Sequence, residues 1–212
     1  MPTCGATQSF NELAPGSLAD LTGGEDYSAA RFEDDAWGAA PLKQASLEEC
    51  LLARCDLTAK RLEGVELHEC RLDACNLANG RWVKTRVSKS DLVKCRATGL
   101  QLIDANLSEV RFTGCKLNLA AVLGAKLRSC VFDKCDLREA DFQQVVLTNV
   151  TFRGCDLRGA RFAGCQQTGL DLRGTHLAGA LLEPPMLKKA TVDASQLVDL
   201  APLFGLTVRP AE

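Results

Sequence analysis

The sequence predicts an all-β solenoid, a rod in which one short unit is stacked many times. The first observation is a large apolar residue at every fifth position between Cys130 and Phe162. The second is a small or thin residue two places before each of them. The large residues are Phe132, Leu137, Phe142, Leu147, Phe152, Leu157 and Phe162. Because a helix face repeats about every 3.6 residues and a strand face about every two, a period of five requires a coiled backbone.

The repeated unit also matches a known pattern. Two consecutive units, Cys155 to Gly159 and Ala160 to Gly164, read Cys-Asp-Leu-Arg-Gly and Ala-Arg-Phe-Ala-Gly. They resemble the A(D/N)LXX consensus of the pentapeptide-repeat family. The resemblance implies a right-handed quadrilateral β-helix, in which residues one coil apart stack at the strand spacing of roughly 4.8 Å.

The register divides the chain into three parts. Residues 1–24 carry no repeat and are expected to form a leader or an N-terminal cap, and residues 25–192 form the β-helix. Residues 193–212 form a C-terminal cap and dimerisation segment. Within the frame, which we follow from Phe32 to Leu197, the central residue is polar only at Gln167, which needs a hydrogen-bond partner.

Lys60 is a second irregularity, because it occupies the slot that otherwise holds a small residue. An unpaired buried ammonium would be costly. We therefore expect its stem to lie along the wall and its ammonium to reach solvent, with a functional role as the alternative.

The eleven cysteines invite a metal or disulfide interpretation, which their positions do not favour. Ten occupy the slot two residues before a central residue of the repeat, where cysteine serves as a small hydrophobe. These are Cys50, Cys55, Cys70, Cys75, Cys95, Cys115, Cys130, Cys135, Cys155 and Cys165. No Cys-x2-Cys pair of the zinc type is present. Disulfides between stacked cysteines remain an alternative, although parallel side chains join poorly, and we expect reduced thiols.

The sequence offers no catalytic constellation. It contains no Ser, His and Asp grouping and no phosphate-binding glycine loop, and the glycines from Gly154 to Gly179 recur every five residues as corners of the coil. We therefore predict no enzyme activity, no catalytic residue, no cofactor and no metal.

The C-terminal segment is apolar and has helix signals. Asp193 and Gln196 form a capping-box pattern, and Gly205 is a helix stop. We expect a helix from Ala194 to Leu200, with Pro202 limiting its extension. The apolar residues that we predict to cap the rod and to form a homodimer interface are Leu197, Leu200, Leu203, Phe204, Leu206 and Val208.

An apolar stripe is predicted on the outer wall. Val83, Ile103 and Leu123 follow central residues one coil apart, with Ala121 beside Leu123, and are our candidate partner-binding residues. The alternative is isolated surface apolars covered by long neighbouring side chains.

Charge is uneven along the chain. Residues 1–40 hold seven acidic residues against Arg31 alone, whereas the remainder holds 24 basic and 20 acidic residues. A basic group from Arg81 to Arg96 follows an acidic group from Glu48 to Glu69. This arrangement is typical of a solvated mixed wall.

Two functions follow from these features. The resemblance extends to the Qnr- and MfpA-type members, which implies a dimer that binds DNA gyrase or topoisomerase IV. Such a protein protects the enzyme from quinolone-like or natural poisons, in some members as a mimic of duplex DNA. The alternative is a rigid scaffold that binds another protein through the stripe. We expect a protein without membrane association, because the sequence lacks an apolar run long enough to span a bilayer. We also expect it to be cytoplasmic and not to bind nucleic acid directly.

Overall fold

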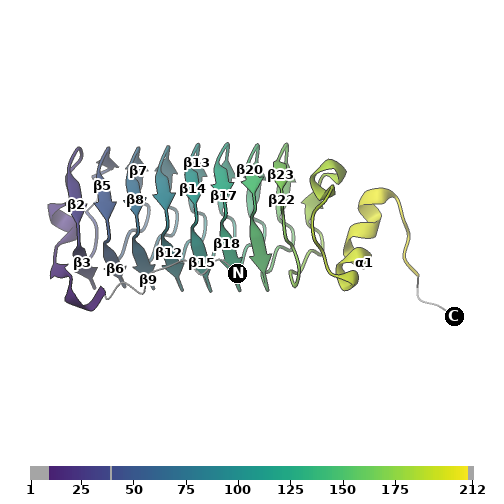
Figure 1. The fold of residues 1–212 in the computed structure, drawn as a ribbon, viewed down its shortest axis with the longest axis horizontal. Coiled ribbons are helices and arrows are strands. Elements are labelled where there is room, and N and C mark those ends of the chain that lie inside the picture. Colours follow the sequence, from purple (N-terminus) through teal and green to yellow (C-terminus); the bar gives the residue numbers. More distant parts are fainter. Residues whose placement is uncertain (1–9, 39, 210–212) are drawn as a thin grey trace.

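A computed structural model describes residues 10–38 and 40–209 as a rod of stacked coils that ends in a short helical segment (Figure 1). Each coil takes 20 residues, since Trp82 pairs in parallel with Leu102 in the next coil. The predicted fold class, a quadrilateral pentapeptide-repeat β-helix with a short C-terminal helix, is confirmed.

Three sides of the rod are parallel sheets of 8 strands each. Sheet 1 comprises β1 (Ala14–Pro15), β3 (Ala30–Glu33), β6 (Leu51–Ala53), β9 (Arg71–Asp73), β12 (Asp91–Val93), β15 (Arg111–Thr113), β18 (Val131–Asp133) and β21 (Thr151–Arg153). Sheet 2 comprises β4 (Leu42–Lys43), β7 (Arg61–Glu63), β10 (Arg81–Val83), β13 (Gln101–Ile103), β16 (Ala121–Leu123), β19 (Asp141–Gln143), β22 (Arg161–Ala163) and β24 (Leu181–Leu182). Sheet 3 comprises β2 (Asp26–Ser28), β5 (Ser46–Glu48), β8 (Glu66–His68), β11 (Arg86–Ser88), β14 (Asn106–Ser108), β17 (Lys126–Arg128), β20 (Val146–Thr148) and β23 (Gln166–Thr168).

The fourth side, which we call the bridged side, lies between sheets 1 and 2 along the chain. Single parallel bridges join its coils, for example Asn76 to Arg96 and Arg96 to Lys116. A tight turn follows each central residue there, as in the hydrogen bond of 3.1 Å from the Ala120 N–H to the Leu117 carbonyl. These turns leave only one bridging residue per coil, so no continuous strand forms.

The corners between sides hold residues with positive φ. Gly154, Gly159 and Gly164 have φ of 58, 69 and 63°, which confirms the predicted glycine corners. Non-glycine residues take the same conformation at other corners, among them Lys84 (52°) and Leu119 (59°). The coil therefore imposes the left-handed conformation, and glycine only lowers its energetic cost.

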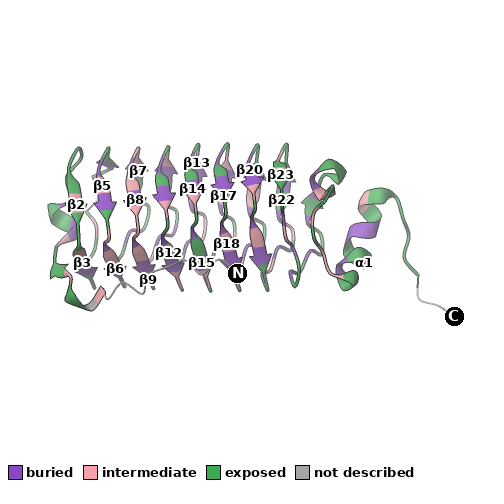
Figure 2. Cartoon of the chain, viewed as in Figure 1, coloured by how far each residue is buried: buried purple, intermediate pink, exposed green. Residues whose placement is uncertain are grey.

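The core consists of side chains stacked in columns along the rod axis. Figure 2 shows that buried residues recur on the strands of successive coils. The rings of Phe142 and Phe162 are parallel with centroids 4.6 Å apart, and Phe112 stacks on Phe132 at the same distance. Phe152 meets Phe142 edge to face at 6.2 Å. The coil spacing equals the stacking distance of aromatic rings, so phenylalanines in successive coils gain ring contacts in addition to burial.

Cysteines line the corner before the bridged side. Cys55, Cys75, Cys95, Cys115, Cys135 and Cys155 occupy six successive coils, and all six are buried free thiols. Each thiol lies against a main-chain carbonyl of the previous coil, as Cys75 Sγ does at 3.2 Å from the Leu52 oxygen. Elsewhere in the core, burial raises the pKa of Cys130 to about 11. Its thiol is therefore protonated and packs as a small side chain.

Residues 10–24 lie over the first coil. β1 pairs with β3, and Leu18 and Leu21 are buried in the core. The Asp35 carboxylate accepts hydrogen bonds from the Leu18 N–H (2.6 Å) and the Ser17 hydroxyl (3.1 Å). These bonds hold the pKa of Asp35 below its usual value, the Leu18 N–H contributing most. The cover shields the end of the stacked strands from water and from other strands. Residues 1–9 of the predicted leader lie outside the described residues.

Lys60 does not reach solvent, so the expectation for its ammonium was wrong. Its side chain is only 4% exposed. Nζ donates to the carbonyls of Gly38 (2.8 Å) and Ala40, and it lies 4.6 Å from the centroid of the Trp37 ring. Burial lowers the pKa of Lys60. The buried charge of this lysine is satisfied by backbone oxygens and the Trp37 ring of the preceding coil.

The regular repeat is interrupted at Pro184, although Thr191 still bridges to Asp171 one coil before it. Residues Pro184–Leu187 form the 3-10 helix η3 in place of a strand, because two prolines lack the N–H that a strand ladder needs. Gln167 finds its partners here, since Nε2 donates to the carbonyls of Met186 (2.9 Å) and Lys188 (2.7 Å).

The C-terminal segment is helical from Ala194 to Phe204. Its parts are η4 (Ala194–Gln196), α1 (Leu197–Leu200) and η5 (Ala201–Phe204). We had expected Pro202 to limit this helix, but the helical segment continues through it. A proline is tolerated here because it lies in the first turn of η5. Gly205, with φ of 71°, terminates the segment as predicted.

The predicted capping pair also joins this segment to the rod. Gln196 Oε1 accepts from the Asp193 N–H at 2.7 Å, and its Nε2 donates to the carbonyl of Leu172 at 2.7 Å. Among the described residues, no helix has the length and apolar character needed to cross a membrane.

The column of rings gives a direct test of the register. We expect Phe142→Ala to lower the free energy of unfolding by about 3–5 kcal/mol, because it removes stacked and edge contacts and leaves a cavity. The exposed neighbour supplies the control, and Gln143→Ala is expected to change stability by less than about 0.5 kcal/mol. Chemical denaturation followed by circular dichroism measures both, and equal losses would contradict the inward assignment of Phe142.

Candidate protein-binding surface

The predicted stripe exists on sheet 2. Val83 pairs with Ile103 and Ile103 with Leu123, so the three side chains stack in successive coils, as expected. All three are half-buried on the outer face. The residue before each of them, Trp82, Leu102 or Val122, points inward and is buried. Glu63 and Gln143 occupy the same position one coil before and one coil after. The stripe is therefore a limited patch, three residues long, with polar ends.

Leu119 extends this apolar surface, and our sequence interpretation missed it. It lies at the corner between the bridged side and sheet 2, two residues before Ala121, and is 54% exposed. Its φ is 59°, a conformation that is unusual for a bulky residue. A signal was present in the sequence, because the equivalent corners one coil away on either side hold Gly99 and Glu139. We call Val83, Ile103, Leu119, Ala121 and Leu123 the apolar patch.

Charges of both signs lie on the coils that carry the apolar patch. Arg81 and Lys84 flank Val83 in the same coil, and Arg96 and Lys116 stack on the adjoining bridged side. All four are exposed, and none forms an ion pair within the described residues. Arg81 makes only a long hydrogen bond of 3.4 Å to Gln101. On the acidic side, Asp104 lies at the corner beyond Ile103, Glu139 holds the corner of Leu119 one coil along, and Asp141 pairs in register with Ala121.

The acidic residues in the coils at the N-terminal end differ from these cations, because they form ion pairs with basic residues of neighbouring coils. Lys89 pairs with Glu69 at 3.0 Å, and Arg86 pairs with Glu66. Arg54 contacts Asp34 at 2.6 Å and lowers the pKa of that carboxyl. In the middle of the rod, residues 81–134 carry eleven basic and four acidic residues, so this part of the chain has a net positive charge.

Paired Asp and Arg residues mark the C-terminal half. Asp136 binds Arg138, Asp156 binds Arg158, and the Arg side chain holds the pKa of each carboxyl below its usual value. The described residues contain no cluster of three or more histidine, cysteine or acidic side chains that could hold a metal ion. In each pair the two opposite charges neutralise each other.

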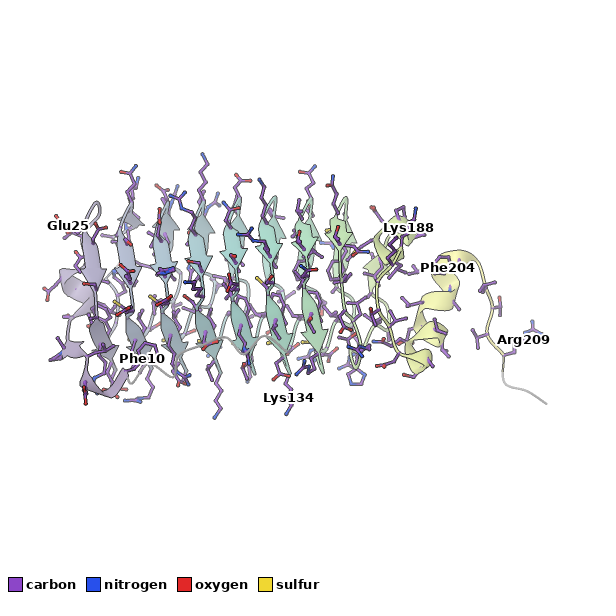
Figure 3. All side chains as sticks on the ribbon, viewed as in Figure 1. Phe10, Glu25, Lys134, Lys188, Phe204 and Arg209 are labelled. Carbon is purple, nitrogen blue, oxygen red and sulfur yellow. The ribbon has the colours of Figure 1, made fainter. Side chains whose placement is uncertain are left out.

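A second apolar surface lies at the C-terminal end, where Figure 3 shows Phe204 on the helical segment beyond the last coil. Of the predicted dimer residues, Leu200 is buried in its own chain and Leu203 is half-buried. The other four are exposed, together with Val198, which the sequence analysis did not include. The exposed set is Leu197 (57%), Val198, Phe204 (56%), Leu206 and Val208. The expectation that Leu197 is a central residue of the frame was wrong, because the chain has already left the coil.

Comparison with family models agrees with the geometry of the coils. The model described as a pentapeptide repeat region matches residues 65–142, and the model described as pentapeptide repeats in eight copies matches residues 40–79 and 125–164. Together the two models span residues 40–164. The chain belongs to the pentapeptide-repeat family. A search among curated proteins found no match to this pentapeptide-repeat protein.

The chain is similar to several solved structures at low sequence identity. A trypsin-treated variant of QnrB1, a plasmid-mediated fluoroquinolone resistance protein, is 20% identical, with 92% of this chain and 95% of that chain covered and a TM-score of 0.44. HetL, involved in heterocyst differentiation regulation in the cyanobacterium Nostoc, is 23% identical, with coverage of 79% and 89% and a TM-score of 0.43.

Leu119 provides a test of whether the apolar patch reduces stability. In this pentapeptide-repeat protein we expect Leu119→Asn to raise the free energy of unfolding by about 0.5–1 kcal/mol, because asparagine tolerates positive φ better than leucine. Leu119→Ala keeps the strained backbone and serves as the control. A marked loss of stability in the asparagine variant, measured by chemical denaturation, would show that Leu119 contributes to the fold instead.

Proposed function

We propose that this pentapeptide-repeat protein acts by binding another protein on the outer wall of its rod, at the apolar patch. The observation that carries the proposal is Leu119, an exposed apolar residue in a left-handed corner, next to the stacked stripe on sheet 2. Folding alone gains little from such a residue at this corner, since glycine would meet the backbone requirement at lower cost. Contiguous exposed apolar residues on a rigid surface are typical of protein contacts.

For the partner we propose a type II topoisomerase, DNA gyrase or topoisomerase IV, which the protein would protect from quinolone-like or natural poisons. The support is the resemblance of the repeats to Qnr- and MfpA-type members and the apolar C-terminal end. QnrB1 is a fluoroquinolone resistance protein, whereas HetL takes part in the regulation of differentiation. A scaffold for a different partner protein is therefore the second candidate.

The charge of the wall does not favour mimicry of duplex DNA. Such a mimic needs a continuous acidic surface. Here residues 81–134 carry an excess of basic residues, and Arg96 stacks directly on Lys116. We therefore propose a contact with the topoisomerase protein itself and not with its DNA-binding groove.

The topoisomerase proposal is tested with purified enzymes. We expect this protein to inhibit supercoiling, or to reduce poison-stabilised cleavage, in assays with DNA gyrase and topoisomerase IV. Ile103→Asp should abolish the effect by placing a charge in the apolar patch. Val93→Asp is the matched control, because Val93 occupies the same repeat position in the same coil on sheet 1 and is equally half-buried. No effect of the wild-type protein on either enzyme would exclude this partner and leave the scaffold candidate.

We further propose a homodimer formed through the exposed apolar residues of the C-terminal segment. Val198 and Phe204 are each 56% exposed, which is a large apolar area for a segment this short. A second copy offers the same surface, so a two-fold contact would cover both at once.

Light scattering and sedimentation at several concentrations test the dimer. We expect the wild-type protein to show twice the chain mass of 22.8 kDa, and Phe204→Asp to be monomeric. Thr207→Asp adds the same charge at an exposed polar residue nearby and should remain dimeric. A wild-type monomer at every concentration would refute the proposal.

A further inference from the structure

We propose that Ser88 on the outer wall is a nucleophile that hydrolyses small activated carboxylic esters, with His68 as its general base. This activity goes beyond the binding function proposed above and does not use the apolar patch, because both residues lie on sheet 3. We predicted no serine and histidine grouping from the sequence, since the two residues are 20 positions apart. The coil brings them into register on β8 and β11.

The Ser88 hydroxyl and the His68 ring are in hydrogen-bond contact. Ser88 Oγ lies 2.8 Å from His68 Nδ1, and on the other side of the ring Nε2 lies 3.5 Å from the Glu69 carboxylate. A carboxylate beside Nε2 favours the tautomer with its proton there, which leaves the Nδ1 lone pair to accept from Ser88. Nucleophile, base and orienting carboxylate thus follow one another as in a serine hydrolase triad, with the roles of the two ring nitrogens exchanged.

Two ion pairs hold these side chains in place. Arg86 pairs with Glu66 on one side of the contact. Lys89 pairs with Glu69 at 3.0 Å on the other side, and this lysine holds the pKa of Glu69 below its usual value, so the carboxylate is ionised at neutral pH. Both strands are also paired on each side within sheet 3, which fixes their backbone. A general base needs such a fixed position relative to its nucleophile.

Donors for the negative charge that develops on the ester oxygen lie on the opposite side of Ser88 from His68. Ser108 follows Ser88 in the same column, one coil along. Arg128 Nη2 donates to the Ser108 hydroxyl at 3.4 Å, which leaves the Ser108 proton free to donate. An ester attacked by Ser88 can therefore direct its carbonyl oxygen toward this hydroxyl and the guanidinium behind it.

The reaction needs only the ester and water. Ser88 Oγ attacks the carbonyl carbon, its proton passes to His68 Nδ1 and from there to the departing alcohol, and an acyl ester of Ser88 forms. Water then attacks the acyl carbon and gives a proton to Nδ1, and that proton returns to Ser88 Oγ as the carboxylic acid leaves. Both side chains are half-buried on the outer wall. A small ester reaches them directly, but little of it is bound, so a good leaving group is required.

Two reagents test the proposal on the full-length protein. We expect steady turnover of p-nitrophenyl acetate, followed by the absorbance of released nitrophenol. We also expect a fluorophosphonate probe to label Ser88, with the site located by peptide mass spectrometry. Ser88→Ala and His68→Gln should each lower the turnover about tenfold or more, and His68→Gln should slow labelling of Ser88 to the same extent.

Matched controls separate this pair from other serines and histidines. Ser46→Ala changes another half-buried outward serine of sheet 3, and His176→Gln changes an exposed histidine, and both should behave as the wild type does. Circular dichroism confirms that each variant keeps the fold. Absence of labelling in the wild type, equal turnover in Ser88→Ala, or equal labelling in His68→Gln would overturn the proposal.

Glu69 is a positioning residue, because it contacts the His68 ring and not the ester. We expect Glu69→Gln to lower kcat for p-nitrophenyl acetate with KM unchanged, since it alters the orientation of the base and leaves ester binding intact. A change in KM with kcat unchanged would show that Glu69 does not act through His68.

Discussion

Stacking of identical side-chain positions at the strand spacing is the constraint on which the rest of this structure depends. Parallel pairing repeats every coil, so each inward residue contacts the residues one coil before and one coil after it. A planar ring satisfies this spacing especially well, as Phe112, Phe132 and Phe152 do. A thiol does so in a narrow corner, which explains why Cys75 and its stacked neighbours are packing groups. The cysteine content that first suggests metal or redox chemistry is thus a consequence of the corner's size.

The same constraint creates problems wherever the stack is interrupted. Lys60, Gln167 and Gln196 are the polar residues at such places, and each donates to main-chain carbonyls that the repeat no longer pairs or covers. At the N-terminal end the Asp35 carboxylate does the equivalent for the Leu18 N–H. Covering both ends prevents a terminal coil from pairing with strands of other molecules.

Because the interior is committed to stacking, the outer wall is free to carry function. Residues one coil apart form straight columns, so three substitutions in one column produce a continuous stripe such as that of Val83, Ile103 and Leu123. On the bridged side, Arg96 and Lys116 stack as exposed cations without an ion pair among the described residues. A rod of this kind presents a rigid pattern that a partner protein can match, with little loss of conformational entropy on its own side.

The sequence by itself determined the coil, because a period of five with a small residue two places before a large one is incompatible with any other regular packing. It therefore located the cysteines, the corner glycines and the stacked stripe. It did not determine where the coil ends, since Leu197 keeps the periodicity although it begins α1, after the last bridge between coils at Thr191. It also could not place the Lys60 ammonium, which depends on carbonyls brought together from the preceding coil. Nor did it show which apolar residues are exposed: the difference between Leu119 and Leu200 arises only when the corner and the terminal helix are folded against their neighbours.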